Sequence, residues 1–238
     1  MLELQVGVAK IGKYATPESG DTLEMIERPH GGFSFVLADG QGSGRGAKTL
    51  SNLVTTRAIS MLKDGARDGA VARAVHDYLY AYRHGQVSAT LNIVSVDLNA
   101  KTVLISRNNQ CPFYVIDENG TTTYNEPSTP IGLYPMTKPI ITQIDLRPYL
   151  YVVVFTDGII HAGRRYNESI ELDNYLGNFN VMQGRSAQAV TDEILLRAIE
   201  LDRNRPTDDM SVIVLAALPM DGENKVRRMT VTFPVERA

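Results

Sequence analysis

The stretch that decides the fold is residues 90–124, TLNIVSVDLNAKTVLISRNNQCPFYVIDENGTTTY. It contains short segments rich in Val, Ile, Phe and Thr, which predict β-strands at Thr90–Leu98, Thr102–Ser106, Phe113–Asp117 and Thr121–Tyr124. Only short turn-forming segments, such as Asn119-Gly120, separate them. Strands this close in sequence pair as antiparallel hairpins, because a parallel pair needs a crossover of roughly a dozen residues.

The residues on either side extend this pattern. Further strands are predicted at Gln5–Ile11, Thr22–Glu27, Phe33–Ala38, Ile140–Leu146, Tyr149–Thr156 and Met210–Leu218. Helical spacing of apolar residues predicts helices at Ala47–Lys63, at Ala70–Tyr82 with Asp68 as its N-cap, and at Ser186–Asp202. This order is typical of an α+β fold with helices packed outside antiparallel sheets.

The domain organisation follows from the same reading. No composition break interrupts residues 1–218, so we expect one domain there. Residues 219–238 form a short C-terminal extension, in which the alternation of Met229–Val235 predicts one more strand.

Composition excludes several classes of protein. The chain has 238 residues, a net charge of −3 and 43% hydrophobic residues, as in an ordinary globular protein that does not bind nucleic acid through a basic surface. A single cysteine, Cys111, excludes an internal disulfide and a cysteine-based zinc site. No apolar run approaches the roughly 20 residues that span a bilayer, so we expect a cytoplasmic protein with no membrane contact.

Aspartates stand where predicted buried strands meet loops. They are Asp39-Gly40 after one strand, Asp157-Gly158 after another, and Asp208-Asp209 before a third, with Asp21 near the N-terminus. Acids clustered at strand ends repel one another unless cations neutralise them, and oxygen ligands favour Mg²⁺ or Mn²⁺. Asp-Gly is also the commonest hairpin turn, but here no returning strand follows Gly40 or Gly158.

The motifs, taken in order, resemble the metal-dependent (PPM, type 2C) protein phosphatases, specifically their bacterial SpoIIE branch. The matching segments are Ser19-Gly20-Asp21, Leu37-Ala38-Asp39-Gly40-Gln41-Gly42-Ser43-Gly44, Thr156-Asp157-Gly158 and Asp208-Asp209-Met210-Ser211-Val212, with weaker matches at Ala89-Thr90-Leu91 and Thr129-Pro130-Ile131-Gly132-Leu133. The chain looks most similar to stand-alone RsbX-like members, because it shows no sensor domain or membrane anchor.

This resemblance implies a four-layer α-β-β-α sandwich with a centre for two divalent cations, Mn²⁺ or Mg²⁺. Asp39 would bridge both ions, the Gly40 carbonyl and Asp21 would complete one, and Asp157 and Asp208 would hold the other. Asp39 and Asp157 would act in catalysis through a metal-bridging water. Asp209 is the less expected ligand.

The resemblance also implies a substrate. It would be phosphoserine or phosphothreonine on a bacterial regulatory protein, a STAS-type anti-anti-sigma factor or stressosome component. The helices within residues 47–84 would act as a switch that couples partner binding to metal occupancy. The oligomeric state stays open.

Two other hypotheses compete with this reading. Residues 42–49 differ by one residue, Ala47, from a nucleotide-binding P-loop, although the β-rich middle lacks the alternation of strands and helices that such folds need. A pseudophosphatase that only binds a partner is the second. His30, His76, His84 and His161 show no metal-ligand spacing, so we expect surface or packing positions for them.

Overall fold

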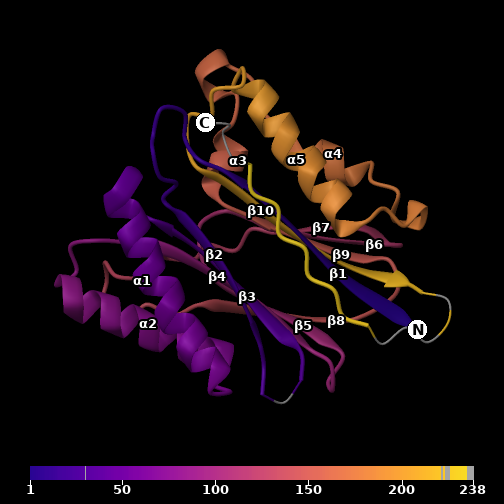
Figure 1. The fold of residues 1–238 in the computed structure, drawn as a ribbon, viewed down its shortest axis with the longest axis horizontal. Coiled ribbons are helices and arrows are strands. Elements are labelled where there is room, and N and C mark those ends of the chain that lie inside the picture. The colour runs from indigo at the N-terminus through magenta and orange to yellow at the C-terminus, as the bar shows by residue number, and fades with distance from the viewer. Residues whose placement is uncertain (30, 221, 223–225, 235–238) are drawn as a thin grey trace.

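The computed structural model of the protein describes residues 1–29, 31–220, 222 and 226–234, and its strands form two stacked sheets (Figure 1). Each sheet has five strands. Sheet A has the order β1 (Leu2–Ile11), β10 (Met210–Pro219), β9 (Leu150–Phe155), β6 (Phe113–Asp117) and β7 (Gly120–Tyr124). Sheet B has the order β2 (Asp21–Glu27), β3 (Phe33–Gly40), β4 (Ala89–Asp97), β5 (Thr102–Asn108) and β8 (Ile140–Asp145). Every pair of neighbouring strands is antiparallel, as predicted.

Helices cover the outer face of each sheet (Figure 1). On sheet B lie α1 (Gly44–Lys63) and α2 (Asp68–Arg83), whose apolar faces share a core with β3 and β4. On sheet A lie α3 (Asp157–His161), α4 (Leu172–Gly177) and α5 (Ala187–Leu201), together with 3-10 turns at Arg164–Tyr166 and Val181–Gln183. The predicted α+β class and the four-layer α-β-β-α arrangement are confirmed.

A third core fills the space between the sheets and explains the long apolar runs in the sequence. In β9, Tyr151, Val153 and Phe155 pack toward the helices, whereas Leu150, Val152 and Val154 pack toward sheet B. Both faces of this central strand are therefore buried, which is why it reads as continuously apolar rather than alternating.

Some local predictions are wrong. Asp68 is the first residue of α2 and not its N-cap, which is Arg67 and makes no side-chain cap bond. The Asp68 carboxylate instead accepts a hydrogen bond from Arg28 Nη1 at 2.8 Å. The short helices α3 and α4 were not predicted, because periodicity is hard to detect over one or two turns.

The predicted C-terminal strand is also wrong over Met229–Pro234, where the structure has no strand; Val235 lies outside the described residues. Met229, Val231 and Phe233 remain 67–79% exposed. Alternation predicts a strand only where a sheet edge receives it, and this segment joins neither sheet. Within the described part of the chain, no helix combines the length and apolar composition needed to cross a bilayer.

Candidate metal centre

The acids singled out from the sequence lie at strand ends that come together at one end of the sandwich. Asp21 begins β2 and Asp39 lies directly opposite it near the end of β3. Asp157 follows β9 as the first residue of α3, and Asp208 precedes β10. The charges of Asp21, Asp157 and Asp208 all act on Asp39, so the two sheets contribute to one acidic cluster.

Two glycines allow helices to approach the cluster closely. A Cβ on Gly40 would lie 2.1 Å from the Ala47 carbonyl oxygen of α1, and one on Gly158 would lie 2.1 Å from the Asp209 carbonyl oxygen. Real Cβ atoms do not come this close. Neither glycine has a positive φ. The Asp-Gly pairs therefore serve close packing at the site and are not hairpin turns.

Asp21 is held by hydroxyl groups from the opposite sheet. Its Oδ2 accepts hydrogen bonds from Thr156 Oγ1 at 2.9 Å and Ser211 Oγ at 2.6 Å. Its Oδ1 is buried and has no hydrogen-bond partner among the described residues. A buried carboxylate oxygen left unpaired is costly, so this atom fits a cation ligand.

Burial and mutual repulsion change the acidity of these groups. Burial, followed by the charges of Asp21, Asp157 and Asp208, raises the pKa of Asp39 to about 8. Burial raises the pKa of Asp21 to about 6, although the bonds from Ser211 and Thr156 oppose the shift. Burial is also the main cause that raises the pKa of Asp208. Such a cluster is unfavourable when fully ionised and is stabilised by divalent cations.

Two lysines contact the backbone of the cluster. Lys10 Nζ and Lys48 Nζ each donate to the Asp21 carbonyl oxygen at 2.9 Å, and Lys48 also donates to Thr22 Oγ1 at 3.0 Å. Burial and the Lys48 charge lower the pKa of Lys10. Lys48 is thus hydrogen-bonded to residues of β2. In addition, the strand before α1 and the strand after α2, which are β3 and β4, pair in the antiparallel direction. These observations contradict the P-loop hypothesis for residues 42–49.

Both carboxylate oxygens of Asp209 are used by loop amides, although its charge also acts on Asp21 and Asp39. Asp209 Oδ1 accepts from the Lys13 amide at 2.9 Å and its Oδ2 accepts from the Gly20 amide at 2.7 Å. Both oxygens thereby hold the loop that joins β1 to β2, directly before Asp21. This arrangement agrees with the expectation that Asp209 is the less suitable ligand.

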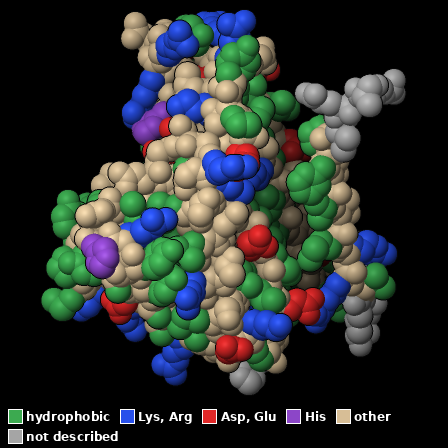
Figure 2. Space-filling view, turned by 60° about the vertical axis from the view of Figure 1, so that its left-hand side comes forward, with side chains coloured by type: hydrophobic (Ala, Val, Ile, Leu, Met, Phe, Trp, Pro, Cys, Tyr) green, Lys and Arg blue, Asp and Glu red, His purple; other side chains and the backbone are tan. Residues whose placement is uncertain are grey.

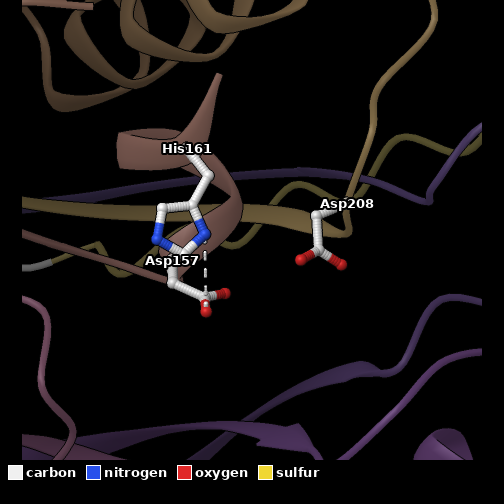
Figure 3. Close-up of side chains that lie close together, drawn as sticks. All are labelled: Asp157, His161 and Asp208. Atoms are coloured by element: carbon white, nitrogen blue, oxygen red, sulfur yellow. Dashed lines mark ion pairs between the residues drawn. The ribbon is translucent and has the colours of Figure 1, made fainter. Parts of the chain in front are cut away.

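His161 joins the cluster, contrary to the expectation from the sequence. It lies four residues after Asp157 on α3, and Figure 3 shows its ring beside the Asp157 carboxylate with Asp208 across from them. Figure 2 shows histidine and acidic side chains close together where the narrower upper part of the molecule meets the wider lower part. His76 is a packing residue and His84 is exposed, as expected, while His30 lies outside the described residues.

The family of the chain follows from a comparison with family models. The model described as Stage II sporulation protein E (SpoIIE) matches residues 29–217, which is most of the sequence and includes Asp39, Asp157 and Asp208. The chain belongs to the SpoIIE family. The family and the fold are those of the PPM-type serine/threonine phosphatases, as the resemblance predicted. No curated protein sequence matches the chain significantly.

Solved SpoIIE-type and related structures share the fold. The PP2C phosphatase domain of SpoIIE from Bacillus subtilis, with a fragment of its regulatory domain, superimposes with a TM-score of 0.77 at 19% identity, over 91% of this chain and 64% of that one. RsbX in complex with magnesium gives 0.69 at 14% identity, over 91% and 100%. The catalytic domain of PstP with two manganese ions gives 0.69 at 15% identity, over 92% and 100%.

Several residues around this SpoIIE-family site were missed from the sequence alone. Thr156 and Ser211 flank the acids but look like ordinary strand residues until the two sheets are stacked. Lys10 belongs to the first predicted strand and Asp21 stands directly before the second, so no pattern within one strand indicates that the two residues meet. A signal for His161 did exist, because residues four apart on a helix share a face, and Asp157 and His161 have that spacing.

Proposed function

We propose that the protein is a metal-dependent serine/threonine protein phosphatase whose centre holds two divalent cations. Asp39 would contact both ions, Asp21 and the Gly40 carbonyl would complete one site, and Asp157 and Asp208 the other. The observation that carries this proposal is the buried Asp21 Oδ1, which has no partner among the described residues, within a cluster of acids from both sheets.

The donor set fits Mg²⁺ or Mn²⁺, since carboxylate and carbonyl oxygens suit these hard ions. When bound, such ions supply an acidified water and neutralise charge on the phosphate oxygens. The chain itself positions the acids. Thr156 and Ser211 orient Asp21 through hydrogen bonds. Gly40 leaves room for α1, and Gly158 leaves room for the Asp209 backbone. The Asp209 side chain holds the loop that precedes Asp21.

The substrate we propose is phosphoserine or phosphothreonine on a STAS-type regulatory protein, an anti-anti-sigma factor or stressosome component, in the cytoplasm. The support is family membership together with the resemblance to RsbX-like members. We further propose that residues 1–218 form the catalytic unit, with 219–238 as an extension, and that helices α1 and α2 transmit partner binding to Asp21 through Lys48.

The test is manganese-dependent release of phosphate from a phosphoserine protein. Wild type should release phosphate with Mn²⁺ and stop when EDTA is added. Asp39→Asn should lose at least about a hundredfold in rate, the usual cost of removing one key electrostatic group. Asp145→Asn, which removes an exposed carboxylate of β8, is the matched control and should behave as wild type.

Absence of hydrolysis in wild type toward every phosphoprotein tried would favour the pseudophosphatase hypothesis instead. Full activity in Asp39→Asn would show that hydrolysis does not depend on this cluster.

A further inference from the structure

Three side chains at the exposed rim of the acidic cluster form a mixed nitrogen and oxygen donor set. One donor atom each from Asp157, His161 and Asp208 lies within 4.8 Å of the other two. His161 Nδ1 is 3.7 Å from Asp157 Oδ2. Figure 3 shows the ring and both carboxylates directed toward the same space.

The backbone of α3 fixes this arrangement. Asp157 and His161 are four residues apart within one helix, so both side chains lie on the same face. Gly158 presses α3 against the Asp209 backbone, because any Cβ there would lie 2.1 Å from the Asp209 carbonyl oxygen. Asp208 precedes that residue directly, so its position relative to α3 is set by main-chain packing rather than by a flexible loop.

The Asp157–His161 contact by itself does not explain the cluster. A separation of 3.7 Å is longer than a hydrogen bond. The His161 and Asp157 side chains are 33% and 40% exposed, and exposed ion pairs of this kind contribute little to stability. Ligand atoms at about 2.1 Å from one ion lie about 3.0–4.2 Å apart when octahedral, so small rotations would let all three contact one cation.

We propose that His161 is a nitrogen ligand of the cation held by Asp157 and Asp208. This inference rests on the proposed metal centre and adds a residue to it. An imidazole nitrogen suits Ni²⁺ and Zn²⁺, whereas Mg²⁺ prefers oxygen and keeps its waters. One of the two cation positions therefore prefers transition metals, and the other, lined by Asp21, Asp39 and the Gly40 carbonyl, offers oxygen alone.

The direct test is pulsed electron paramagnetic resonance of the Mn²⁺-loaded full chain, prepared without a histidine tag. Electron spin-echo modulation from a coordinated ¹⁴N nucleus should be present in wild type. It should disappear in His161→Ala and in His161→Gln, which retains an oxygen donor of similar reach. The matched control is His84→Asn, which changes an exposed histidine in the left-handed conformation that asparagine tolerates, and it should keep the signal.

Calorimetric titration gives a second readout. Loss of a ligand should cost at least as much as loss of a group that orients one, so His161→Ala should weaken Ni²⁺ or Zn²⁺ binding by about ten- to a hundredfold or more. Mg²⁺ binding should change by less than about threefold, because nitrogen contributes little to its coordination.

Bound Mn²⁺ without ¹⁴N modulation in wild type would overturn the inference, as would modulation that persists in His161→Ala. Phosphate release is measured on the same samples. Hydrolysis without a nitrogen signal rejects the His161 ligand alone, whereas a nitrogen signal without hydrolysis of any phosphoprotein rejects the proposed function and leaves the ligand standing.

Discussion

At the residue scale, the protein concentrates ionisable acids where its fold can least accommodate their charge. Asp21 is 1% exposed and faces Asp39 across the β2–β3 pair. The hydroxyl groups of Thr156 and Ser211 satisfy only one of the two Asp21 oxygens. The polypeptide thus stabilises this site incompletely, and the proposed cations would supply the rest.

The pH dependence of stability follows from Asp39. Its pKa is raised to about 8 in the folded chain from 3.8. Between these values the folded state binds more protons than the unfolded state, so the free energy of unfolding falls as pH rises from about 4 to about 8. Metal-free wild type should melt at a lower temperature at pH 8 than at pH 5.5, measured by circular dichroism in EDTA. Asp39→Asn should flatten this dependence, and an unchanged slope in that variant would contradict the assignment.

The hydroxyl of Ser211 should increase the affinity for metal ions, because it orients the Asp21 carboxylate. Ser211→Ala removes the 2.6 Å hydrogen bond to Asp21 Oδ2, and we expect Mn²⁺ affinity to fall about ten- to a hundredfold, as for other groups that orient ligands. The matched control is Ser106→Ala, since Ser106 is a buried strand serine whose hydroxyl has no hydrogen-bond partner among the described residues. Equal affinities of the two variants in calorimetry would show that Ser211 does not position Asp21.

At the element scale, helices lie directly on the strand ends that carry the acids. α1 packs against Gly40, and its Lys48 reaches back to the Asp21 carbonyl. α3 packs against the Asp209 backbone through Gly158. The candidate metal centre is therefore built at the contacts between elements, which is the geometry that the proposed coupling of helix packing to the acids requires.

Gly40 should tolerate no side chain. Gly40→Ala places a Cβ 2.1 Å from the Ala47 carbonyl oxygen, and overpacking of this kind costs about 1–3 kcal/mol. Gly46→Ala, in the first turn of α1, is the control: no atom lies within 4 Å of the added Cβ, and alanine favours the helix over glycine, so this variant should be at least as stable as wild type. Urea denaturation distinguishes the two. Equal stability would mean that α1 does not press on β3 as described.

At the scale of the whole molecule, the alternation and spacing of strands predict most of the fold. Residues 90–124 read as hairpins because each strand is short and each turn is explicit, and the structure pairs them as expected for β4–β5 and β6–β7. The sequence does not reveal that β5 and β6 belong to different sheets. That division depends on which faces meet across the sandwich, a long-range property.

The site was predictable to the same extent. Asp39, Asp157 and Asp208 follow from carboxylates at strand ends, whereas Ser211 and Lys10 meet Asp21 only after the sheets stack. At Met229–Pro234 the sequence instead predicts a structure that does not form. The residues alternate as in a strand, but no sheet edge pairs with the segment.

Metal binding should stabilise the entire fold, because the centre joins both sheets. A ligand at about 100 times its dissociation constant adds about 2.7 kcal/mol, which corresponds to a rise of roughly 5–10 °C in melting temperature for a chain of this size. Differential scanning calorimetry with and without Mn²⁺ measures this rise. Asp39→Asn should show little of it, and a full rise in that variant would place the ions elsewhere.

The most direct measurement of the central claim is anomalous X-ray diffraction from crystals grown with Mn²⁺. The account predicts two manganese peaks at the end of the sandwich where Asp21, Asp39, Asp157 and Asp208 meet, with Asp39 in contact with both. Manganese bound only at other positions, or no peak within reach of Asp39, would contradict it.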